Sequence, residues 1–125
     1  MPNFEDLINA AKENRWDFVD EHIAVLANDE GVTAWALNEG LEDADGNVRD
    51  LAASVLEKSP ASLPEATKTK LLQLMTDDAN PYVRFRSAFA LYVRGERSPE
   101  VITKMQEAEK DSDVSGIAKD YLSGE

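Results

Sequence analysis

The stretch DADGNVRDLAASVL, residues 43–56, decides the fold, because DANPYVRFRSAFAL, residues 78–91, repeats it at a spacing of 35 residues. An Asp opens both copies, a Val-Arg pair follows five residues later, and an Ala and a Leu recur near the end. Self-similarity at a period of about 20–50 residues is typical of chains built from stacked structural repeats. We therefore expect one supersecondary unit to recur along this chain.

A third, shortened copy follows near the C-terminus. Asp111 and Val114 correspond to Asp43 and Val48 after a deletion of two residues, and Ala118 and Leu122 keep the later spacing. Degraded end copies are expected of a stacked array, because a terminal unit has one neighbour and must face water on its other side.

Apolar residues recur at spacings of three and four almost throughout, which predicts helices rather than strands. Turn and capping signals divide the chain into eight helices, the fifth with Pro64 in its first turn, the sixth opened by Pro81 and ended by Gly95. Apolar stripes lie at residues 4–11, 16–26, 35–41, 48–56, 71–75, 83–91 and 114–122, and Ser98-Pro99-Glu100 marks the start of the seventh helix. The predicted fold is all-α, an α-α superhelix of about four stacked helical hairpins in one domain over residues 1–125.

The repeated phrase resembles the short HEAT-like repeat of phycobilin-lyase-type proteins, whose pattern is Asp-x-Asp-x-x-Val-Arg followed by small residues and a Leu. The matching residues are Asp43, Asp45, Val48, Arg49, Ala52, Ala53 and Leu56 in one copy, and Asp78, Asn80, Val83, Arg84, Ala88 and Leu91 in the next. The resemblance implies an armadillo-type superhelix. The tetratricopeptide and ankyrin signatures, which have similar periods, are absent.

The resemblance also implies a ladder between successive units, formed by the Asp near the turn and the Arg after the Val. Here the pairs would be Arg49 with Asp78 or Asn80, and Arg84 with Asp111 or Asp113. Asp45 holds the equivalent turn position in the first copy. These side chains are interpreted as structural cross-links.

Composition excludes several classes of protein. The net charge is −12, from 25 acidic and 13 basic residues, so a general affinity for nucleic acid is not expected. The chain has no Cys, which excludes disulfides and thiolate chemistry, and no apolar run is long enough to cross a membrane. We expect a cytoplasmic, monomeric protein without membrane contact.

Catalytic constellations are sparse. His22 is the one histidine and lies on an apolar helix face, so it is interpreted as structural and no metal site is expected. Metal-dependent hydroxylases among HEAT-like proteins use paired His-Glu motifs, whereas this chain has a single Glu21-His22 in reverse order. Glycine-rich phosphate loops and nucleophile elbows are absent. The sequence therefore predicts neither enzymatic activity nor a cofactor.

One helix departs from the repeat. The positions that usually face outward on the concave side hold Asp50, Ser54 and Glu57 in the first copy but Phe85, Phe89 and Tyr92 in the second. Arg86 and other arginines flank this aromatic stripe. Aromatic and Arg residues dominate binding hot spots, so Phe85, Phe89, Tyr92 and Arg86 form the candidate partner-binding surface. The alternative is that a neighbouring helix covers the stripe.

Two functions follow from these observations. The first is a non-catalytic interaction module or scaffold that binds a protein or peptide on its concave face. The second is a bilin-lyase-like enzyme or accessory factor acting on a chromophore-bearing protein. The absence of Cys and the single His favour the first.

Overall fold

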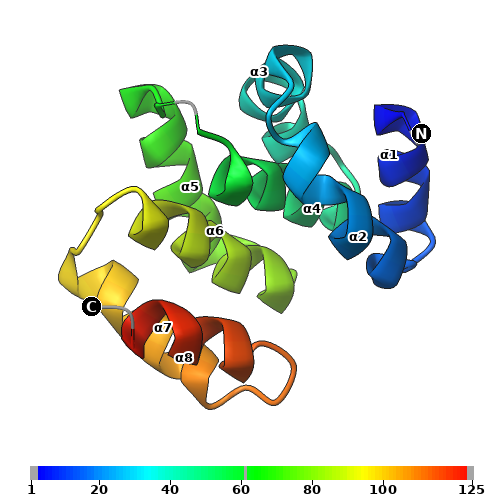
Figure 1. Cartoon of the computed structure of the whole chain (residues 1–125). Helices are drawn as coiled ribbons and strands as arrows, with labels where there is room; N and C mark the ends of the chain where they lie inside the picture. Colours follow the sequence, from blue (N-terminus) through cyan, green and yellow to red (C-terminus); the bar gives the residue numbers. More distant parts are fainter. Residues whose placement is uncertain (1–2, 61, 124–125) are drawn as a thin grey trace.

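The computed structural model describes residues 3–60 and 62–123, and over these residues the protein is all-α, as predicted, with no strand (Figure 1). Eight α-helices and one 3-10 helix follow one another: α1 (Phe4–Lys12), α2 (Trp16–Leu26), α3 (Glu30–Asn38), η1 (Gly40–Glu42), α4 (Gly46–Lys58), α5 (Glu65–Asp77), α6 (Pro81–Val93), α7 (Pro99–Glu109) and α8 (Ser115–Ser123).

Short polar side chains begin most of these helices. Asp29, Asp45, Asn80 and Ser98 each accept a hydrogen bond from a backbone N–H in the first turn of the helix that follows, which satisfies a donor the helix itself cannot. Pro81 and Pro99 occupy the first helical position of α6 and α7, where a missing N–H costs nothing. Gly95 follows α6 with a φ of 94°, a conformation that favours glycine.

Two helix boundaries differ from the prediction. The third helix ends at Asn38, and Leu41 lies in η1, because Gly40 brings the backbone against α4. A Cβ atom on Gly40 would lie 2.6 Å from the Cβ of Ala52 and 2.7 Å from the ring of Trp35. Pro64 is the N-cap of α5 rather than part of its first turn.

Consecutive helices pack in pairs. Each odd-numbered helix contacts the even-numbered helix that follows it, and α4 and α6 contact each other at the centre. Figure 1 shows α1 and α2 at one end of the molecule and α7 and α8 at another, with α4 and α6 between them. One apolar core includes residues of all eight helices, among them the fully buried Leu7, Leu51, Leu71, Phe89 and Met105.

The described residues contain no helix that is both long and apolar enough to cross a membrane. The domain expected over residues 1–125 includes residues 1–2, 61 and 124–125, which lie outside the described part of the chain.

Candidate functional site

The repeated phrase folds into the same turn three times. Asp43, Asp78 and Asp111 each accept a hydrogen bond from the backbone N–H two residues later, at 2.8, 2.8 and 2.9 Å. In the first two copies that residue, Asp45 or Asn80, then caps the next helix. The shortened third copy therefore keeps the hydrogen bond that defines the turn.

Arg49 links the first turn to the second. Its guanidinium donates to both carboxylate oxygens of Asp78, at 2.8 and 3.1 Å, and to the backbone oxygen of Asp43. Burial alone would raise the pKa of Asp78, but the hydrogen bonds from Arg49 and from the Asn80 backbone outweigh burial and lower it. This is one of the two pairings that the sequence predicted for Arg49.

Arg84 does not form the second expected rung. It donates to the backbone oxygen of Asp78, as Arg49 does to that of Asp43, and over residues 3–60 and 62–123 it contacts neither Asp111 nor Asp113. The phenol of Tyr82 reaches Asp113 instead. In the third copy the turn from Asp111 to Asp113 is kept, but the two residues that precede the Val in the other copies are missing.

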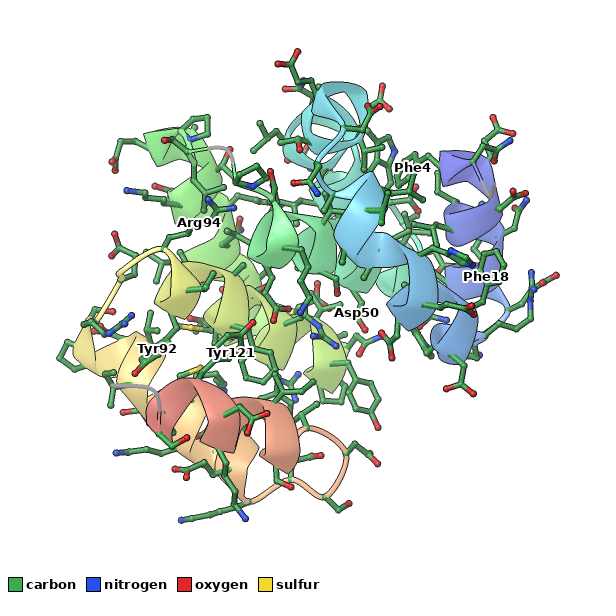
Figure 2. The ribbon with its side chains drawn as sticks, in the orientation of Figure 1. Phe4, Phe18, Asp50, Tyr92, Arg94 and Tyr121 are labelled. Carbon is green, nitrogen blue, oxygen red and sulfur yellow. The ribbon has the colours of Figure 1, made fainter. Side chains whose placement is uncertain are left out.

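The aromatic stripe is covered at Phe89 and Tyr92, which is the alternative that the sequence left open beside an exposed binding surface. These residues are 0% and 3% exposed, and Phe85 is half-buried against the core. Tyr121 of α8 covers the stripe, with ring centroids 5.7 Å from Phe89 and 6.4 Å from Tyr92. Figure 2 shows Tyr92 and Tyr121 side by side between α6 and α8.

The polar positions of α4 are also buried, contrary to expectation. Asp50, Ser54 and Glu57 are 6%, 5% and 4% exposed, because Arg86 reaches across from α6. Arg86 donates to Glu57 at 3.0 Å, and its Nε lies 3.4 Å from Asp50 Oδ1. The hydroxyl of Tyr121 donates to the other oxygen of Glu57. We call these four residues (Asp50, Glu57, Arg86 and Tyr121) the inner network.

Burial sets the ionisation of the inner network. It raises the pKa of Asp50, and the charge of Arg86 offsets only part of that rise. Burial alone would lower the pKa of Arg86. The charges of Glu57 and Asp50 outweigh burial, so the pKa of Arg86 is raised. Burial and the neighbouring Glu57 raise the pKa of Tyr121. The network is thus a buried cation between two carboxylates, closed by a phenol.

A hollow of about 920 Å³ opens beside the inner network, at the start of α4 and α6. Such a volume lies within the ~300–1,000 Å³ of ordinary ligand sites. Helix α2 and the start of α8 border it, and Figure 2 shows Asp50 in the space between α2 and α6. Its charged and aromatic side chains are Trp16, Asp20, Arg49, Asp50, Tyr82, Arg86 and Asp113.

Of the residues that line the hollow, sequence analysis identified Arg86 as a partner-binding candidate, Asp50 as a concave-side position, and Arg49, Asn80 and Asp113 as structural cross-links. It did not point to Trp16, Asp20 or Tyr82. A signal was available for the inner network, since Asp50 and Glu57 are seven residues apart on one helix face and Arg86 has the opposite charge in the next copy. Nothing local marks Trp16 and Asp20, because α2 lacks the repeated phrase.

His22 lies outside the hollow, half-buried, with its ring centroid 4.7 Å from that of Phe18. Within the described ranges no three His, Asp or Glu side chains come together as a metal site would need. Comparison of the chain with protein-family models, with curated proteins and with solved structures gave no match.

Proposed function

We propose that the chain is a non-catalytic interaction module, a short HEAT-like superhelix of about four helical hairpins, which binds a partner polypeptide in the hollow on its inner side. The observation that carries the proposal is the hollow itself, with its aromatic and charged lining. The even-numbered helices and the turns that precede them supply this lining, which is the arrangement expected for the concave side of a stacked array.

The lining is suited to recognition rather than to bond-breaking chemistry. Asp50 is a buried acid with a raised pKa, which can mark a catalytic group, but Arg86 faces it. The lining contains neither a Ser, a Cys nor a His that could act as nucleophile or base beside it. Tyr82 and Trp16, in contrast, are the residue types that contribute most to binding hot spots.

A substitution that fills the hollow with a large side chain tests the proposal. Ala79 is exposed and lines the hollow, so Ala79→Trp should fill the space without removing a core contact. The matched control is Ala44→Trp, because Ala44 holds the same place in the first copy of the phrase, is exposed, and does not line the hollow.

The experiment compares proteins retained from an extract of the native host by the wild type and the two variants, followed by calorimetry with the purified partner. We expect a partner held by the wild type and Ala44→Trp but lost from Ala79→Trp. If all three proteins retain the same set, binding occurs elsewhere and the proposal is wrong.

A further inference from the structure

We propose that the hollow seats a lysine or arginine side chain of the partner polypeptide. The inference rests on the proposed function, since it names the chemistry that the partner brings to the same site. The inference is based on two observations. The guanidinium groups that line the hollow are already paired, whereas several of its carboxylate oxygens are not, and two aromatic side chains lie at its edge.

The cations of the hollow are already paired. Arg49 donates through all three of its nitrogens, to Asp78 and to the backbone oxygens of Asp43 and Ala44. Arg86 is buried between Glu57 and Asp50. Breaking such a buried pair leaves a charge uncompensated, so neither guanidinium is available to an incoming anion at low cost.

The carboxylates that line the hollow have oxygen atoms that could still accept a hydrogen bond from a ligand. Asp20 is exposed on α2 and makes no hydrogen bond or ion pair with the described residues, although its charge reaches Arg86. Asp113 accepts from Tyr82 through one oxygen, and its other oxygen has no partner in the described part of the chain. Deeper in, Oδ1 of Asp50 is buried without a hydrogen bond, and Nε of Arg86 lies 3.4 Å from it.

Trp16 and Tyr82 complete a site for a cation. A guanidinium or ammonium group is attracted to the face of an aromatic ring, most strongly to Trp, and the attraction adds to that of nearby carboxylates. Tyr82 is 42% exposed, and the hydrogen bond of its phenol to Asp113 holds the ring at the edge of the hollow. An exposed aromatic ring fixed by a carboxylate is positioned for contact from outside.

The N-termini of α4 and α6, which lie beside the hollow, do not change its preference for a cation. The N-termini of α4 and α6 each carry a partial positive charge of about half a unit, which would favour an anion. Asp45 and Asn80 already accept hydrogen bonds from these ends, and Asp45 adds a full negative charge. The net charge of −12 also draws a basic partner and repels an acidic one.

A displayed library of random peptides, split into pools that contain or lack Lys and Arg, tests the inference with the intact chain. Selection on the wild type should enrich sequences with Lys or Arg, and acetylation of the Lys in a selected peptide should abolish its binding. The combined Asp20→Asn and Asp113→Asn variant should bind the selected peptide at least about tenfold more weakly, the equivalent of 1.4 kcal/mol.

The control is Glu21→Gln, which changes the charge of the neighbouring residue on α2, also exposed but outside the hollow. It should bind the peptide as the wild type does. Thermal melts of each variant verify that the fold is kept, and spermidine and inorganic phosphate serve as non-peptide probes of each charge.

The outcomes separate this inference from the proposed function. Peptides without Lys or Arg, bound in a manner that Ala79→Trp blocks, would overturn the cation preference and leave the interaction module standing. Equal loss of binding in Glu21→Gln and the double variant, or tighter binding of phosphate than of the peptide, would also overturn it. Failure of every pool to bind would overturn both.

Discussion

Helices α4 and α6 begin with the same phrase, yet their inner faces carry different chemistry. The face of α4 presents Asp50, Ser54 and Glu57, whereas that of α6 presents Arg86, Phe89 and Tyr92. Each face is buried, and each supplies what the other lacks: the Arg of α6 neutralises the acids of α4. Repeats that pack on one another can therefore diverge into complementary halves while their turn sequence stays constant.

The comparison also explains where the inner side is closed and where it is open. Tyr121 of α8 contacts both halves, packing on the rings of α6 and donating to Glu57 of α4. Toward the starts of α4 and α6 the hollow remains, and Arg49, Asp50 and Tyr82 are among the residues that line it there. The aromatic stripe thus builds the wall beside the site rather than the binding surface.

The largest loss of stability is expected from replacing Phe89, which lies on the aromatic face of α6. Phe89→Ser should destabilise the protein by at least the ~3–5 kcal/mol of a buried Phe→Ala change, because it leaves a cavity and buries a hydroxyl. Denaturant unfolding measures the loss. Val93→Ser, on the same helix but 44% exposed, is the control and should stay within about 0.5 kcal/mol. A small loss at Phe89 would show that the ring is not core.

The variant Arg86→Met tests how much the ion pairs of Arg86 with the acids of α4 contribute to stability. It removes the cation between Asp50 and Glu57, and breaking a buried pair by removing one partner costs about 3 kcal/mol or more. The loss should shrink as the pH falls, because Asp50, whose pKa burial raises, then takes up a proton and no longer buries a charge. Lys70→Met, which removes a surface pair with Glu42, should cost less than about 1 kcal/mol.

A smaller effect is expected at the rung between the two turns. Asp78→Asn should cost about 2 kcal/mol at neutral pH, since Arg49 loses a charge-assisted pair of hydrogen bonds. The pKa of Asp78 is lowered in the folded state, so its contribution is present above the ordinary Asp pKa and is lost as the pH falls through the folded value. Wild-type and variant melting temperatures should therefore converge in acid, whereas exposed Asp77→Asn should change little at any pH.

The turns and the helices were predictable from the sequence because their causes are local. Capping side chains, prolines at helix starts and apolar spacing act within a few residues, and the repeat identified equivalent turns directly. The pairing of Arg49 with Asp78 is one of the two that the resemblance to HEAT-like repeats implied, the other being Arg49 with Asn80.

The site was less predictable because it depends on contacts between distant segments. The burial of Phe89 and Tyr92 follows from where α8 lies, and nothing near residues 85–92 encodes the position of Tyr121. Likewise, Trp16 and Asp20 join the hollow only because α2 lies beside the starts of α4 and α6. A period in the sequence describes equivalent positions, not which of them a neighbour covers.

The measurement that tests the central claim most directly is an NMR map of intermolecular contacts with a bound basic peptide. The account predicts nuclear Overhauser effects from the Lys or Arg side chain of the peptide to the rings of Trp16 and Tyr82, with none to the buried ring of Phe89. Contacts confined to helices α3, α5 and α7, with Trp16 and Tyr82 unperturbed, would contradict it.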